Sequence, residues 1–82
     1  MGRYLVYGLS LCQYCVLTRE YLDSRNIEYV FMNMDEDPVG IREAKEFYGH
    51  NTVPIILKNN LKTGYVKFIG GYADLVESME HE

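Results

Sequence analysis

Two cysteines stand close together near the start of the chain, in the segment Cys12-Gln13-Tyr14-Cys15. If a helix begins at this segment, both sulfur atoms lie on one side of it, close enough to form a disulfide bond. The first turn of a helix presents unpaired N–H groups and a partial positive charge, which stabilise a thiolate. Only the thiolate attacks disulfides, and in such motifs the pKa of the attacking thiol falls to about 3.5–7.5. The segment therefore predicts thiol–disulfide exchange.

The two cysteines have different expected roles. We expect Cys12, the one nearer to solvent, to attack a substrate disulfide, and Cys15, one turn inside the helix, to resolve the mixed disulfide. Other interpretations of the pair stay open. A zinc site would need further ligands, and His50 and His81 are 31 positions apart, not the three to five of a zinc finger. The pair could also be two buried packing cysteines, or a regulatory disulfide in a domain without redox function.

The composition is that of one small globular domain, which we place at residues 1–82. Hydrophobic residues make up 48% of the chain and charged residues 24%, which argues against disorder. Two cysteines are too few for a disulfide scaffold. The net charge of −4 gives no support to a nucleic-acid partner, because an acidic surface repels phosphate. No apolar stretch approaches the ~20 residues that span a bilayer, and a signal peptide is not apparent. We therefore expect a cytoplasmic monomer that binds no membrane.

Hydrophobic patterning predicts a strand, a helix and a second strand in the first half of the chain. Residues 4–7 are β-branched or aromatic and end at Gly8, which is typical of a short buried strand. A helical pattern follows over residues 12–25. Residues 28–33 have a near-continuous apolar run between Glu28 and Asn33, so we expect a strand that is covered on both faces. These three elements form a βαβ unit, whose two strands should be parallel.

A second helix is predicted after this unit. Three acidic residues precede Pro38, so Asp37 is the expected cap and Pro38 the first helical residue. Carboxylates at this end also favour the helix because they lie at the positive end of its dipole. Gly49 is the expected helix end. The expected inner face consists of apolar and aromatic side chains at helical spacing: Ile41, Ala44, Phe47 and Tyr48.

The last third of the chain predicts a hairpin and a helix. We expect a strand at residues 53–57, a turn at residues 59–64 and an antiparallel strand at residues 65–69. Two glycines then break the pattern before a terminal helix at residues 73–81. The order is therefore β-α-β-α-β-β-α. It predicts an α/β fold with a four-stranded mixed sheet and helices on both faces.

The chain resembles the glutaredoxins over nearly its whole length. The segments that carry the resemblance, in family-like order, are Cys12-Gln13-Tyr14-Cys15, Thr52-Val53-Pro54 and Gly70-Gly71-Tyr72-Ala73-Asp74-Leu75. The resemblance implies the thioredoxin-like fold, with Cys12 and Cys15 as the catalytic pair. It also implies a cis peptide bond between Val53 and Pro54, facing the cysteines.

A glutathione site is implied by the same resemblance. The residues expected to bind glutathione are Tyr14, Thr52, Val53, Pro54, Gly71, Tyr72, Ala73 and Asp74. The backbone of Val53 should pair with the cysteinyl part of glutathione like an added strand. The turn that begins at Gly71 should hold the γ-glutamyl end, since helix-start N–H groups bind carboxylates. Asp74 is open to two interpretations, as a partner of the γ-glutamyl ammonium group or as a cap of its own helix.

Two positions depart from the family pattern. Many glutaredoxins have a proline after the first cysteine, where this chain has Gln13, and a lysine three residues before that cysteine, where it has Leu9. The lysine would help to bind the glycine carboxylate of glutathione. Arg42 is a candidate replacement, although a solvated surface arginine is the alternative interpretation. His50 is a candidate for the rim of the same site or for a surface turn.

The resemblance implies a glutathione-dependent thiol–disulfide oxidoreductase, active in electron transport, that reduces protein disulfides and glutathione mixed disulfides. Glutathione would be a co-substrate, with no bound cofactor and no metal. Ribonucleotide reductase is an implied protein partner, with this protein as its hydrogen donor. One alternative is a glutaredoxin-like electron donor that is reduced by thioredoxin reductase, which the missing lysine favours. Another is a carrier of a [2Fe–2S] cluster ligated by glutathione.

Overall fold

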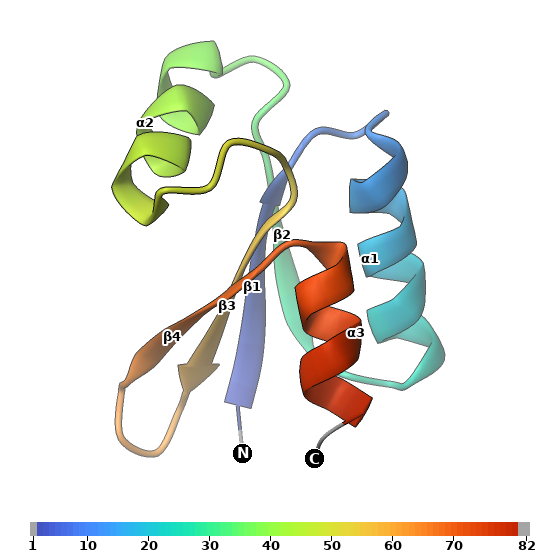
Figure 1. The fold of residues 1–82 in the computed structure, drawn as a ribbon. Coiled ribbons are helices and arrows are strands. Elements are labelled where there is room, and N and C mark those ends of the chain that lie inside the picture. Colours follow the sequence, from blue (N-terminus) through green and yellow to red (C-terminus); the bar gives the residue numbers. More distant parts are fainter. Residues whose placement is uncertain (1, 81–82) are drawn as a thin grey trace.

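The computed structural model describes residues 2–80 and contains the seven elements in the expected order. The strands and helices, drawn in Figure 1, are β1 (Gly2–Gly8), α1 (Gln13–Ser24), β2 (Tyr29–Asn33), α2 (Pro38–Tyr48), β3 (Ile55–Asn60), β4 (Val66–Gly70) and α3 (Tyr72–Glu80). The order predicted from the hydrophobic pattern is thus confirmed. The predicted last residue of the terminal helix, His81, lies outside the described residues.

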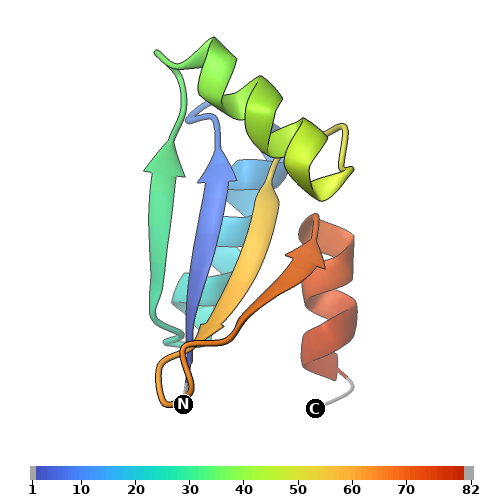
Figure 2. The same cartoon turned by 90° about the vertical axis from the view of Figure 1, so that its left-hand side faces the viewer.

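The four strands form one mixed sheet in the order β2-β1-β3-β4. β1 is parallel to β2 and antiparallel to β3, and β3 is antiparallel to β4. Figures 1 and 2 show α1 and α3 on one side of the sheet and α2 across the upper end of its other side. This is the thioredoxin-like arrangement, and the predicted fold class is confirmed. No helix in the described part of the chain is both long and apolar enough to cross a membrane.

The main core lies between the sheet and the pair α1 and α3. Its buried members come from the central strands β1 and β3 and from these two helices: Tyr4, Val6, Leu22, Ile56 and Leu75. The opposite face of the sheet is covered only in part, because α2 spans one end of it. The side chains of Val30 and Met32 on β2 are more than a third exposed. The prediction that this strand is covered on both faces was wrong, since β2 is an edge strand that α2 covers incompletely.

The second helix has the predicted ends but not the predicted inner face. Asp37 caps it by accepting a 2.8 Å hydrogen bond from the N–H of Gly40, and Gly49 ends it in the left-handed conformation with φ of 63°. Ile41 is buried as expected. Phe47, however, is 79% exposed, and its ring lies edge-on against that of Tyr48. The inner-face prediction for Phe47 was therefore wrong, because the pattern indicated a wider apolar face than the helix buries.

The hairpin is shifted relative to the sequence pattern. Asn59 and Asn60 belong to β3 and not to the turn, since they pair with Arg3 and Gly2 of β1. The side chain of Asn60 then closes the turn by accepting hydrogen bonds from two backbone N–H groups in residues 62–63. These long-range strand pairs add residues to β3 that the local sequence marks as turn-forming.

Candidate functional site

Cys12 lies between the end of β1 and the start of α1, as predicted. It is the N-cap residue, with extended backbone angles, and its carbonyl accepts the first helical hydrogen bond from Val16 at 2.9 Å. Its side chain is partly exposed, and its thiol lies 3.8 Å from the carbonyl oxygen of Val53. Cys12 therefore stands at the amide end of the helix, but its side chain makes no hydrogen bond to the helix N–H groups and instead contacts the segment that precedes β3.

Cys15 is in a different environment although it lies only one turn away. It is a free thiol, as is Cys12, and its side chain is fully buried. Burial raises the pKa of the Cys15 thiol to about 12, and both Cys12 and the charge of Asp35 act in the same direction. A hydrogen bond with the backbone of Leu9 partly opposes this rise in the pKa. Cys15 is therefore protonated near neutral pH, and the Cys12 side chain lies close enough to contribute to the rise in its pKa.

A glycine makes room for the buried sulfur. A β-carbon built on Gly8 would lie 2.6 Å from the Sγ atom of Cys15 and 3.1 Å from the ring of Phe31. Contacts that short do not occur between such atoms, so the last residue of β1 must lack a side chain if Cys15 is to lie there. In the sequence, Gly8 indicated only the end of a strand.

The loop before Cys12 is tied to the end of β2. The backbone N–H of Ser10 donates a 2.9 Å hydrogen bond to Asp35, and the Ser10 hydroxyl donates a second one of 2.5 Å to the other carboxylate oxygen. These two bonds hold the pKa of the Asp35 carboxyl below its ordinary value, the hydroxyl having the larger effect. The sequence showed Asp35 only as one of three acidic residues before a helix.

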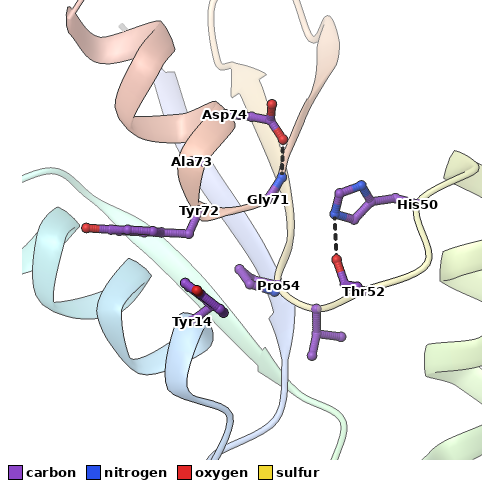
Figure 3. Close-up of a pocket in the computed structure, with 9 residues that line it drawn as sticks. Tyr14, His50, Thr52, Pro54, Gly71, Tyr72, Ala73 and Asp74 are labelled. Atoms are coloured by element: carbon purple, nitrogen blue, oxygen red, sulfur yellow. Dashed lines mark hydrogen bonds between the residues drawn. The ribbon is translucent and has the colours of Figure 1, made fainter.

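A cavity of about 280 Å³ lies beside the Val53 carbonyl that Cys12 contacts (Figure 3). All eight residues predicted to bind glutathione line it, together with His50: Tyr14, Thr52, Val53, Pro54, Gly71, Tyr72, Ala73 and Asp74. The peptide bond between Val53 and Pro54 is cis. The fold thus brings the three segments singled out in the sequence to one place. Their role in binding glutathione stays a prediction.

One wall of this cavity is the start of α3. The carboxylate of Asp74 accepts a 2.9 Å hydrogen bond from the N–H of Gly71, so Asp74 caps its own helix (Figure 3). The ring of Tyr72 lies 6.2 Å from that of Tyr14 and 6.3 Å from that of Tyr21. These ring contacts hold the start of α3 against α1. The N–H groups in the first turn of a helix have no partner within the helix, so they are candidates to bind a ligand.

The other wall contains His50. Its Nε2 atom lies 3.3 Å from the hydroxyl of Thr52, and a β-carbon on Gly71 would lie 3.3 Å from the same nitrogen (Figure 3). The ring also packs edge-on against Phe68. The interpretation of His50 as a rim residue is therefore the one that the structure supports. Its position two residues before Thr52 was the only signal in the sequence.

A second cavity, of about 430 Å³, is lined by the loop before the helix and the residue that holds it: Leu9, Ser10, Leu11, Cys12 and Asp35. None of the residues that line either cavity is a lysine or an arginine. Arg42, the candidate replacement for the missing cation, is exposed on α2 and lines neither cavity. The residues that line the two cavities thus include one carboxylate in each, Asp74 and Asp35, and no lysine or arginine.

Comparisons with known proteins agree with this geometry. The chain is 32% identical over 63 residues to an uncharacterised glutaredoxin-like 8.6 kDa protein of the rubredoxin operon of Clostridium pasteurianum, covering 76% of this chain and 84% of that protein. A buckwheat glutaredoxin solved with glutathione matches the fold with a TM-score of 0.76 and 20% identity, over 98% of this chain and 70% of that one. The NrdH-redoxin of Escherichia coli matches with a TM-score of 0.69 and 20% identity, over 98% of this chain and 96% of that one.

The sequence model of the glutaredoxin family matches residues 5–61, which include the second half of β1, α1, the cysteine pair and the Val53–Pro54 peptide. This match covers more than half of the chain, and the Clostridium relative independently carries the same family description. The chain therefore belongs to the glutaredoxin family, whose chemistry is thiol–disulfide exchange.

Proposed function

We propose that the protein is a dithiol oxidoreductase that takes electrons from glutathione and reduces protein disulfides and glutathione mixed disulfides. The observation that carries the proposal is the position of Cys12. Its sulfur contacts the Val53 carbonyl at the edge of the first cavity, while Cys15 lies buried behind it. A substrate disulfide that pairs with the Val53 backbone would thus be brought to the partly exposed sulfur and not to the buried one.

The reaction runs in two exchange steps. The Cys12 thiolate attacks one substrate sulfur, the substrate S–S bond breaks, and the departing thiolate takes up a proton. The Cys15 thiol then loses its proton and attacks the Cys12 sulfur, which releases the second substrate thiol. The products are a reduced substrate and a Cys12–Cys15 disulfide, a transfer of two electrons. Two glutathione molecules reverse the oxidation of the pair and leave as glutathione disulfide.

The high pKa of Cys15 suits the resolving role. Because the thiol stays protonated near neutral pH, it does not compete with Cys12 for substrate. In the mixed disulfide, the thiolate form of Cys12 is gone, and with it the negative charge that raises the pKa of Cys15. Formation of the mixed disulfide therefore favours ionisation of the second thiol at the step that needs it.

The first cavity offers complementary groups to glutathione. Backbone groups of Val53 can pair with the cysteinyl residue, and N–H groups at the start of α3 can donate hydrogen bonds to the γ-glutamyl carboxylate. Asp74 uses one carboxylate oxygen to cap the helix, and its other oxygen remains for the γ-glutamyl ammonium group. Asp74 can therefore cap its own helix and bind the γ-glutamyl ammonium group at the same time.

Turnover with different reductants tests the proposal. The protein should reduce a glutathionylated peptide when glutathione and glutathione reductase supply electrons. The Cys12→Ser variant should be inactive, whereas Cys15→Ser should keep this activity and lose the reduction of protein disulfides, because removing a glutathionyl group needs only one thiol. Absence of turnover with glutathione would refute the glutathione-dependent function.

A second candidate is an electron donor reduced by thioredoxin reductase. It is favoured by the absence of lysine and arginine among the residues that line the two cavities, since such a cation would bind the glycine carboxylate of glutathione. The solved NrdH-redoxin, which matches 98% of this chain, is described as having a thioredoxin-like activity profile. Reduction by thioredoxin reductase with no turnover by glutathione would identify this function. Ribonucleotide reductase is the proposed electron acceptor to test in both cases.

A further inference from the structure

The second cavity touches the attacking cysteine and contains none of the eight residues that are proposed to bind glutathione. It is lined by Leu9, Ser10, Leu11, Cys12 and Asp35, and none of these residues lines the first cavity. Cys12 lines the second cavity, and its sulfur contacts the carbonyl of Val53, a residue that lines the first. A protein substrate whose disulfide reaches Cys12 therefore comes close to the second cavity.

The polar group of this second cavity is an anion. Asp35 is exposed, and its pKa is lowered by the two hydrogen bonds from Ser10, so it is ionised at neutral pH. An ionised carboxylate has about four lone-pair positions, and Ser10 occupies two of them. Within residues 2–80 no lysine or arginine forms an ion pair with Asp35. Positions on Asp35 thus remain for a positively charged donor from another molecule.

The cavity also has an apolar part, formed by Leu9 and Leu11. Leu11, directly before Cys12, is 94% exposed, and Leu9 is partly exposed. Such apolar surface beside a charged group matches the side chains of lysine and arginine, which lay their methylene stems along apolar surface and keep the charged head in a polar environment. A glutamate or aspartate at this position would face a like charge.

We propose that this cavity binds a lysine or arginine side chain of the protein substrate, next to the cysteine that Cys12 attacks. The stem would lie on Leu9 and Leu11 and the charged head would pair with Asp35. The inference rests on the proposed function, since it names which protein disulfides that reaction prefers. Asp35 is then a specificity-determining residue for disulfides flanked by basic residues.

Single-turnover oxidation of the reduced protein by peptide disulfides tests this proposal without glutathione. The peptides differ only in the residue next to cysteine, which is lysine, arginine, norleucine or glutamate; norleucine keeps the aliphatic stem and removes the charge. The lysine and arginine peptides should react roughly two- to five-fold faster than the norleucine peptide, and the glutamate peptide more slowly, as expected of an exposed ion pair. This advantage should shrink as salt is added.

Two variants locate the effect. Asp35→Asn should abolish the preference for the basic peptides, while Glu36→Gln, which removes the same charge one residue outside the cavity, should retain it. Each preference is the ratio of two rates measured on the same variant, with a basic peptide and with the norleucine peptide. A substitution that changes the reactivity of Cys12 toward all peptides therefore leaves this ratio unchanged. Equal rates for the lysine and norleucine peptides, or a preference that persists in Asp35→Asn, would overturn the inference. Failure to react with every peptide would instead overturn the proposed function, and the inference with it.

Discussion

The Sγ atom of Cys15 lies 2.6 Å from the point where a side chain at Gly8 would begin. The resolving thiol of the proposed reaction is thus packed directly against the backbone at the end of β1. Cys15 is fully buried, so the protein encloses its sulfur on all sides. The position of the second sulfur is therefore set as much by a strand of the sheet as by the helix that carries it.

Substitution of Gly8 tests this packing. Gly8→Ala should lower the free energy of unfolding by about 1–3 kcal/mol, because an added methyl group in a filled core forces its neighbours to shift. It should also slow the reduction of protein disulfides, which needs Cys15, more than the removal of glutathionyl groups, which does not. Denaturant unfolding and the two activity assays measure these effects.

A double variant supplies the control. Cys15→Ala removes the sulfur that the new methyl group would meet, so Gly8→Ala should cost less in the Cys15→Ala background than in the wild-type protein. If the two substitutions were simply additive in their effect on stability, the contact between these residues would not be the cause.

Gly8 also shows where the sequence stops being informative. Its proximity to Cys15 depends on how β1 and α1 pack, which no local pattern reports. Asp35 is a similar case, because its hydrogen bonds with Ser10 join residues 25 positions apart, whereas the sequence showed only an acidic run before a helix. Features that depend on neighbouring residues were predictable: the Asp37 cap, the Gly49 helix end and the placement of Cys12 at a helix start.

The cavity residues were predictable for another reason. They lie in three segments that resemble a known family, and the fold brings these segments together around Val53 and Pro54. The errors arose where tertiary context overrode a local pattern. Phe47 fits an apolar helical face but α2 leaves it exposed, and Asn60 favours a turn but pairs with β1.

The buried thiol makes the stability depend on pH in the alkaline range. Burial raises the pKa of Cys15 from 9.0 to about 12, so above about pH 9 the unfolded chain loses this proton while the folded protein keeps it. The folded state then binds more protons, and stability falls as pH rises from about 9 toward 12, by up to about 1.4 kcal/mol per pH unit. Denaturant unfolding between pH 8 and pH 10 in about half-unit steps measures this fall.

The matched variant for this titration is Cys15→Ser, which has no thiol at the buried position. Its stability should fall less steeply than that of the wild-type protein above about pH 9. Other groups that titrate in this range, Tyr48 among them, are present in both proteins and cancel in the comparison. Parallel curves for the two proteins would show that Cys15 is not the group responsible.

Two substitutions of Asp74 separate its roles as cap and as ligand. Asp74→Asn keeps an oxygen that can accept the hydrogen bond from Gly71 but removes the charge. The KM for glutathione should rise roughly two- to five-fold, the size expected of an exposed charge pair, with little change in stability. Asp74→Ala should show the same rise and also lose about 1 kcal/mol of stability, as the loss of a helix cap does. If Asp74→Asn left the KM unchanged, Asp74 would be a cap alone.

The asymmetry between the two cysteines is the central claim, and mass spectrometry of trapped intermediates tests it most directly. Each single serine variant is reduced, exposed to glutathione disulfide near neutral pH and measured as the intact chain. Cys15→Ser should carry one glutathione, held at the partly exposed Cys12, whereas Cys12→Ser should stay unmodified because its remaining thiol is buried and protonated. Glutathione found on Cys12→Ser and not on Cys15→Ser would contradict the account.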